Sequence, residues 1–171
     1  MKFLIKLITL ATILSGCNSN NEINNYNKEF KEVINKELGF PSNLINYNNH
    51  KYNSFLPKIL ITGASDCGNC IEKLNTWDDF LKQKPFSKVE VIFILMGRDN
   101  PEFRHYIDLN RYQNLTILID STATYMASND IDYKYFQIPM LLDKKNRVRL
   151  VGDPMVDETI LNYYNELLSD F

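Results

Sequence analysis

The chain has 171 residues, with 19 basic and 21 acidic side chains and a formal net charge of −2. This near balance of charge excludes the strongly basic surface on which nucleic-acid binding depends, so no nucleic acid is expected as a partner. The 155 residues that follow position 16 are enough for one domain with a proper core and too few for two.

The first 16 residues have the layout of a secretory signal. Lys2 and Lys6 give a short basic start, and Leu4–Leu14 is a largely apolar stretch. This stretch is too short to remain as a membrane-spanning helix, which takes roughly 20 apolar residues. We therefore expect residues 1–16 to be a cleaved signal peptide that directs the domain out of the cytoplasm.

The four residues Leu14-Ser15-Gly16-Cys17 resemble the lipobox of bacterial lipoproteins. The resemblance implies that Cys17 becomes the first mature residue and carries acyl chains such as palmitate. Cys17 would then be a lipid anchor that holds the domain at a membrane of the bacterial cell envelope, and not a third redox thiol. An ordinary cleaved signal, or a buried N-terminal helix, is the alternative interpretation.

Residues 17–27 are mostly polar, with Asn18–Asn25 holding one apolar residue, which predicts a disordered tether after the anchor. The folded domain is expected to span 28–171. It would open with an amphipathic helix over Lys28–Leu38, where apolar residues recur on one face. The stretch Ser42–Phe55 is less distinct and is consistent with one edge strand or a loop.

From Lys58 onward, strand and helix patterns alternate. Lys58–Thr62 reads as a buried strand, and a helix follows in which Trp77 is a core residue while Asp78 and Asp79 form a solvated face. The remaining predicted elements are strands at Val89–Met96 and Leu115–Ile119, helices at Pro101–Tyr112 and Asp157–Leu168, and a hairpin of Met140–Leu142 with Arg147–Val151. Parallel strands linked by helices predict an α/β fold with a mixed central sheet flanked by helices.

Two cysteines, Cys67 and Cys70, are separated by Gly68 and Asn69 at the predicted strand-to-helix junction. Cys70 belongs to the first helical turn, and Cys67, just before it, is expected to be the more exposed thiol. A helix N-terminus presents free N–H groups and a positive dipole end, which favour the thiolate form of a cysteine placed there. Outside the cytosol, a lone CxxC pair of this kind indicates electron exchange.

From about Phe55 to the C-terminus, the chain resembles thioredoxin-fold proteins, of the membrane-anchored thiol–disulfide oxidoreductase or redoxin type of bacterial envelopes. The CxxC, the pair Ile138-Pro139 before the hairpin, and the turn that begins at Leu142-Asp143 carry the resemblance. It implies a thioredoxin-like three-layer sandwich. It also implies that Ile138 and Pro139 form a cis-proline loop that lies beside the cysteines and binds the substrate backbone.

The same resemblance implies catalytic roles for both cysteines. Cys67 would attack a substrate disulfide, and Cys70 would resolve the mixed disulfide, with no cofactor. The partners would be a protein thiol or disulfide and an envelope electron donor or acceptor. Relatives usually carry an aromatic residue before the first cysteine, where Asp66 stands here. Its carboxylate is expected to oppose the thiolate at Cys67, and the direction of electron flow stays open.

Three other functions fit the sequence less well. A copper-delivery protein of this fold would use two cysteines at CxxxC spacing with a histidine, and His50 and His105 are the only histidines, so no metal site is expected. A thiol peroxidase would need an arginine and a threonine beside a cysteine. A binding lipoprotein with a structural or vestigial disulfide is the third alternative, although a two-residue spacer closes too short a loop to stabilise the fold.

Overall fold

The computed structural model describes residues 21–50, 53–83, 86 and 88–171. The predicted signal peptide (1–16) and the lipid-anchor residue Cys17 lie outside these residues. Within the described part of the chain, no helix is both long enough and apolar enough to cross a membrane.

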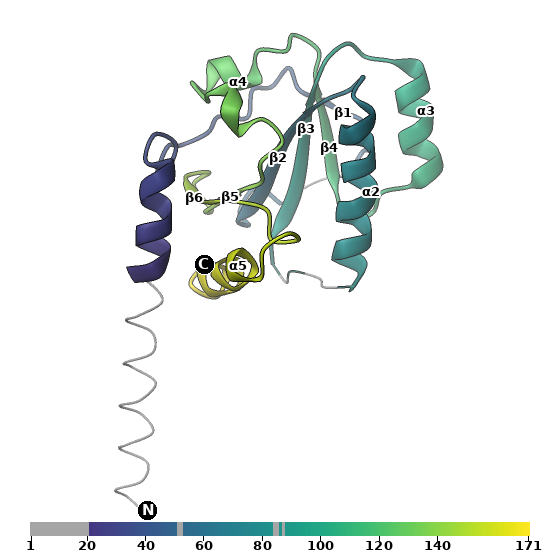
Figure 1. The fold of residues 1–171 in the computed structure, drawn as a ribbon. Helices are drawn as coiled ribbons and strands as arrows, with labels where there is room; N and C mark the ends of the chain where they lie inside the picture. Colours follow the sequence, from purple (N-terminus) through teal and green to yellow (C-terminus); the bar gives the residue numbers. More distant parts are fainter. Residues whose placement is uncertain (1–20, 51–52, 84–85, 87) are drawn as a thin grey trace, which may run out of the picture.

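Among the described residues, six strands form one mixed sheet in the order β1-β4-β3-β2-β5-β6 (Figure 1). The central strands β2, β3 and β4 run parallel, whereas β1, at one edge, and the β5–β6 hairpin are antiparallel to their neighbours. The strands are β1 (Ile45–Asn46), β2 (Lys58–Ala64), β3 (Glu90–Met96), β4 (Thr116–Asp120), β5 (Met140–Leu142) and β6 (Val148–Val151).

Helices cover both faces of this sheet (Figure 1). On one face, α2 (Gly68–Gln83), α3 (Pro101–Asn110) and α5 (Glu158–Ser169) share a buried apolar cluster with the strands. On the other face, a second cluster includes side chains of α4 (Tyr125–Ser128) and of the short 3-10 helix η2 (Tyr133–Tyr135). The three-layer α/β sandwich predicted from the sequence is confirmed.

The middle strand, β3, shows why the central strands read as continuous apolar runs. Val91, Phe93 and Leu95 point into the first cluster, and Ile92 and Ile94 point into the second. Because successive side chains of a strand alternate between faces, a strand that is covered on both faces must be apolar at every position. The same rule explains the run in β2 that leads to the cysteines.

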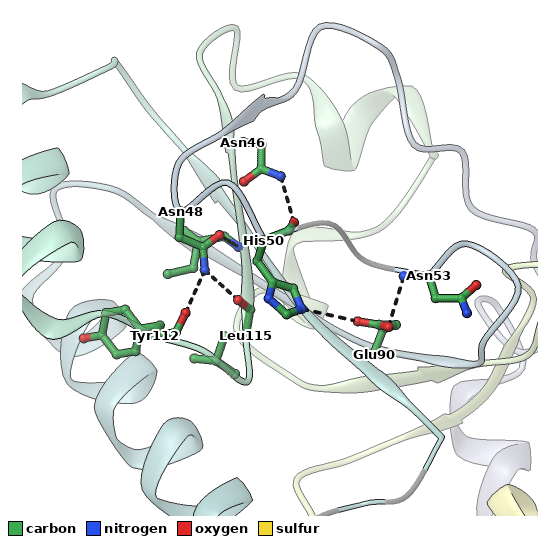
Figure 2. A network of polar contacts seen from close by, with 8 residues as sticks. Asn46, Asn48, His50, Asn53, Glu90, Tyr112 and Leu115 are labelled. Carbon is green, nitrogen blue, oxygen red and sulfur yellow. Dashed lines mark hydrogen bonds and ion pairs between the residues drawn. The ribbon is translucent and has the colours of Figure 1, made fainter.

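Asparagines fasten the otherwise indistinct segment around β1 to the sheet edge (Figure 2). The Asn48 side chain donates to the carbonyls of Tyr112 and Leu115, at 3.1 and 2.6 Å. His50 lies 3.9 Å from a carboxylate oxygen of Glu90, and the N–H of Asn53 donates to the other oxygen of that carboxylate. The segment predicted as an edge strand or a loop therefore contains the two-residue strand β1 and, after it, a loop that the Asn48 side-chain amide holds in place.

The N-terminal segment differs from its prediction in two ways. Residues 21–27, predicted as part of a disordered tether, are helical, and Ile23 is only 3% exposed. The prediction of an amphipathic helix over Lys28–Leu38 is wrong, because helical structure within these residues is limited to the 3-10 helix η1 (Lys28–Phe30).

Residues 35–38 instead pair with residues 146–148, the last of which begins β6. The N–H of Asn35 donates to the Val148 carbonyl at 2.8 Å, and the N–H of Val148 donates to the Lys36 carbonyl at 3.0 Å. An edge strand has unpaired backbone groups, and pairing with them competes with helix formation in this segment. The apolar spacing that predicted a helix still buries Val33 and Leu38.

Asp78 also differs from its prediction. Asp79 is exposed as expected, but Asp78 is only 6% exposed and pairs with Lys82 at 2.7 Å. Leu74, Trp77 and Leu81 form the buried stripe of α2, and position 78 completes the i, i+3, i+4, i+7 spacing of that stripe. The carboxylate is therefore carried to the buried face and neutralised by a lysine one turn further on.

Asp143 closes the β5–β6 hairpin. Its carboxylate pairs with the guanidinium groups of Arg147 (2.9 Å) and Arg149 (3.5 Å), and it accepts a hydrogen bond from the Lys145 N–H. Burial favours the neutral acid, but the hydrogen bonds and the charge of Arg147 outweigh it, so the pKa of Asp143 is lowered. The ionised carboxylate therefore stabilises the folded state.

Replacing Asp143 by Asn should lower the free energy of unfolding by about 2 kcal/mol at neutral pH, because a buried charge-assisted network is lost. Since the pKa of Asp143 is lower in the folded chain, its contribution is present above about pH 4, the ordinary range of an unfolded Asp, and disappears as the pH falls further. Urea unfolding at neutral pH and near pH 3 should show the difference shrink in acid. Asp108→Asn, at an exposed position on α3, is the control. An equal loss at both pH values would contradict this role.

Candidate active site

Cys67 caps the N-terminus of α2. The helix begins at Gly68, one residue later, and the N–H of Cys70 donates both to the Cys67 carbonyl (3.0 Å) and to its sulfur (3.3 Å). A helix-capping side chain ordinarily accepts from the N–H three residues along, so the Cys67 sulfur takes the place of a capping oxygen. The prediction that Cys67 precedes the helix and Cys70 lies in its first turn is confirmed.

Cys70 is packed against the end of β2. It is only 2% exposed, and its sulfur accepts a hydrogen bond from the N–H of Ala64 at 3.4 Å. A Cβ on Gly63 would lie 3.4 Å from the Cys70 sulfur and 2.8 Å from a methyl group of Leu95. Glycine at position 63 therefore makes the room that Cys70 occupies.

The environments of the two thiols differ. Cys67 is half-buried and Cys70 is buried, and both are free. The pKa of Cys70 is raised to about 11, chiefly by burial. The Ala64 N–H works in the opposite direction, whereas the hydrogen bond and charge of Cys67, and the charge of Asp66, contribute to the rise. Cys67 is thus the more accessible of the two thiols, as predicted.

The turn between β2 and α2 is fixed by close packing against the end of β3. The N–H of Ser65 donates to the Met96 carbonyl at 3.0 Å. Gly97 has φ +141°, and a Cβ there would come within 2.3 Å of the Ser65 hydroxyl. Because only glycine fits at position 97, the turn that presents Cys67 is held against a rigid strand end.

Gln137 is a site residue that the sequence reasoning missed. Its side-chain Nε2 lies 3.2 Å from the Cys70 sulfur and 3.9 Å from the Cys67 sulfur. Lys73, one turn after Cys70 on α2, donates to the Gln137 carbonyl at 2.8 Å and pairs with Asp153 at 3.2 Å. The only signal in the sequence was the position of Gln137 in the loop before Pro139.

The expected cis peptide bond before Pro139 is not found. No peptide bond is cis among the described residues, so the Ile138–Pro139 bond is trans. The chain reverses earlier, through the 3-10 turn of η2 and through Gln137, whose φ of 65° is left-handed. This local geometry lets the chain enter β5 with Pro139 in the common isomer.

Ile138 and Pro139, predicted to bind substrate, are held within the fold. Ile138 is half-buried against the second apolar cluster, and its N–H donates to the Tyr135 carbonyl at 3.1 Å. Pro139 is buried, and its carbonyl accepts from the N–H of Gly152. Their loop reaches the cysteines through Gln137. A substrate backbone that used the Ile138 N–H would first displace its bond to Tyr135, and the binding role of both residues stays a prediction.

The two histidines lie apart from this site. His50 is paired with Glu90 at the β1 edge, and His105 is exposed on α3. Among residues 21–50, 53–83, 86 and 88–171, no group of three or more His, Cys, Asp or Glu side chains is arranged to hold a metal ion.

No protein-family model matches the chain, and no curated protein matches it in sequence. Solved structures do match. The C-terminal domain of a candidate thiol-disulfide oxidoreductase from Bacteroides thetaiotaomicron has a TM-score of 0.58 at 14% identity, over 81% of this chain and 97% of that chain. The reduced N-terminal domain of PilB from Neisseria meningitidis has a TM-score of 0.52 at 16% identity, over 72% and 92%.

A third similar structure is the exposed lipoprotein thioredoxin of Streptococcus pneumoniae, with a TM-score of 0.51 at 15% identity, over 75% of this chain and 97% of that chain. At such low identity, the likeness concerns the fold. Together with the sheet order and the position of the cysteines, it shows that the chain has a thioredoxin-like fold, with Cys67 and Cys70 at the junction of β2 and α2.

Proposed function

We propose that the protein carries out thiol–disulfide exchange through Cys67 and Cys70. The observation that carries the proposal is the arrangement of the pair, with a half-buried free thiol that caps α2 and a buried free thiol one turn along. The thioredoxin-like fold of the chain supports the same assignment. A protein disulfide, or a protein dithiol in the reverse direction, is the substrate class.

In the first step, the Cys67 thiolate attacks one sulfur of a substrate disulfide. A bond forms between Cys67 and that sulfur, the substrate S–S bond breaks, and the other substrate sulfur leaves as a thiolate that takes a proton from water. The helix N-terminus favours the negative charge on the attacking sulfur. The accessible position of Cys67 assigns it this step.

In the second step, the Cys70 thiolate attacks the Cys67 sulfur. The Cys67–Cys70 disulfide forms, the bond between Cys67 and the substrate breaks, and the second substrate sulfur leaves as a thiolate. Two electrons have then passed from the protein to the substrate. A dithiol electron donor in the cell envelope would restore the reduced pair, and an oxidant partner would run the cycle backwards.

Burial protects Cys70 from external reagents and keeps its thiol mostly protonated in the reduced protein. Formation of the mixed disulfide then supplies the electrophilic sulfur that Cys70 attacks. The pKa of about 11 means that little Cys70 thiolate exists near neutral pH in the reduced protein. Asp66 adds to this effect from the exposed turn before Cys67. We therefore assign the half-buried Cys67 as the attacking thiol and the buried Cys70 as the resolving thiol.

We also propose that the domain lies in the bacterial cell envelope and is attached to a membrane through acylated Cys17. The support is the order of a basic start, an apolar stretch and Leu14-Ser15-Gly16-Cys17. One of the similar structures is itself named as a lipoprotein thioredoxin. Envelope proteins with exchangeable disulfides would be the partners at this location.

The exchange reaction is tested with single cysteine variants. Cys67→Ser should abolish reduction of insulin disulfides, because the accessible nucleophile is lost. Cys70→Ser should also stop turnover, but it should accumulate a covalent protein–substrate mixed disulfide that mass spectrometry detects. Unchanged insulin reduction in Cys67→Ser would overturn the proposed function. Binding of copper in a manner that depends on Cys67 would favour the metal-delivery alternative.

The anchor is tested in a bacterial host that processes lipoproteins. The full chain should take up radiolabelled palmitate and fractionate with membranes, whereas Cys17→Ala should take up no label because the acylated sulfur is absent. Asn18→Ala, one residue further on, is the matched control and should be labelled like the original chain. Equal labelling of Cys17→Ala would contradict the assignment of the anchor.

A further inference from the structure

Gln137 has a backbone conformation that favours glycine. Its φ is 65°, in the left-handed region that few residues other than Gly, Asn and Asp adopt, and this conformation has an energetic cost for a residue with a side chain. Glycine at position 137 would avoid that cost. Position 137 instead has a glutamine, whose side-chain amide contacts both sulfurs. This contact suggests that the amide itself has a role at the site.

The Gln137 amide lies within reach of both sulfurs and is closer to the sulfur of Cys70. The Gln137 Nε2 carries two hydrogens and lies 3.2 Å from the Cys70 sulfur and 3.9 Å from the Cys67 sulfur. The Ala64 N–H reaches the Cys70 sulfur separately, at 3.4 Å. The buried sulfur is therefore approached by two N–H donors that carry no formal charge.

The loop that presents Gln137 is tied to the cysteine helix. Lys73 donates to the Gln137 carbonyl and also pairs with Asp153, in the loop between β6 and α5. The Lys73 and Asp153 side chains are only 22% and 15% exposed. Since Lys73 lies one turn after Cys70 on α2, the same helix positions the buried sulfur and the amide that reaches it.

We propose that Gln137 is a catalytic residue of the resolving step, in which its side-chain N–H hydrogen-bonds to the Cys70 thiolate as this thiolate attacks the Cys67 sulfur of the mixed disulfide. The proposal rests on the proposed function of the same site. Cys70 loses its proton to solvent before the attack. The new Cys67–Cys70 bond forms as the bond from Cys67 to the substrate breaks, and the substrate sulfur leaves with the electron pair. Lys73 is a positioning residue that acts through Gln137.

The resolving step has the greater need of such a donor. Cys67 already has the helix N-terminus and the Cys70 N–H to stabilise negative charge. Cys70 is buried, where an isolated charge is costly, and the nearby carboxylate of Asp66 opposes a negative charge on its sulfur. A neutral donor lowers this cost without adding a charge that would itself need a partner.

The test uses the aromatic disulfide dithiobis(nitrobenzoate), which releases one coloured thiolate when Cys67 attacks and a second when Cys70 resolves the adduct. Rapid mixing with the reduced protein should therefore show two phases. Gln137→Met and Gln137→Gly should each slow the second phase about tenfold or more, because a hydrogen bond to a charged sulfur is lost, and leave the first phase unchanged.

Gln137→Gly separates this role from a structural one. It relieves the left-handed backbone, so its midpoint of urea unfolding should stay the same or rise while its second phase slows. Arg111→Gly is the matched control, because Arg111 also has a positive φ (47°) but lies at the C-terminus of α3. It should leave both phases unchanged.

The part played by Lys73 is tested by a double-mutant cycle. Lys73→Met should slow the second phase in the original chain but add no further slowing to Gln137→Met, because Lys73 acts only through the amide. Additive effects would overturn the positioning role. An unchanged second phase in both Gln137 variants, or equal slowing of both phases, would overturn the catalytic role. If the unmodified protein shows no first phase, the proposed function itself fails.

Discussion

The hydrogen bond from the Cys70 N–H to the Cys67 sulfur is the contact on which the site depends. It makes a thiol the cap of α2, so the attacking sulfur lies at the positive end of the helix and its partner lies one turn inside. The two residues between the cysteines follow from this geometry. A capping side chain accepts a hydrogen bond from the N–H of the third helical residue, which here is Cys70.

The sheet supplies the rigidity that this contact requires. β2 pairs with β3 along its whole length, as far as Ala64 and Met96, and with β5 over Lys58–Leu60. Because it is also buried on both faces, its carboxyl end is a fixed platform for the turn that leads to Cys67. Two glycines permit close approach at this platform, Gly63 beneath Cys70 and Gly97 beside Ser65. From the other side, the loop that carries Gln137 closes over the sulfurs and is tied to α2 through Lys73. Strain at Gln137 is the local cost of bringing an amide to a buried thiol.

The sequence predicted the parts of the fold that depend on local periodicity. The apolar runs of β2 and β3, the stripe of α2 and the position of Cys67 before the helix all follow from spacing along the chain. The failures involve partners that are distant in sequence. Residues 35–38 have helical spacing but pair with residues 146–148, where β6 begins. Gln137 lies 67 residues from Cys70, and no pattern around either residue indicates that they meet. Asp78 lies on the buried stripe by its spacing, but its polar character favours a solvated position, so the two signals conflict.

The most direct test of the central claim is the reduction potential of the cysteine pair. The protein would be equilibrated in buffers of graded reduced and oxidised glutathione, and its thiols trapped and counted by mass spectrometry. An exchanging pair predicts that Cys67 and Cys70 are lost together in one two-electron transition, to an internal disulfide, at a potential above about −300 mV. The claim would be contradicted if the pair stayed in one redox state across the whole range, or if glutathione remained attached to Cys67 without release by Cys70.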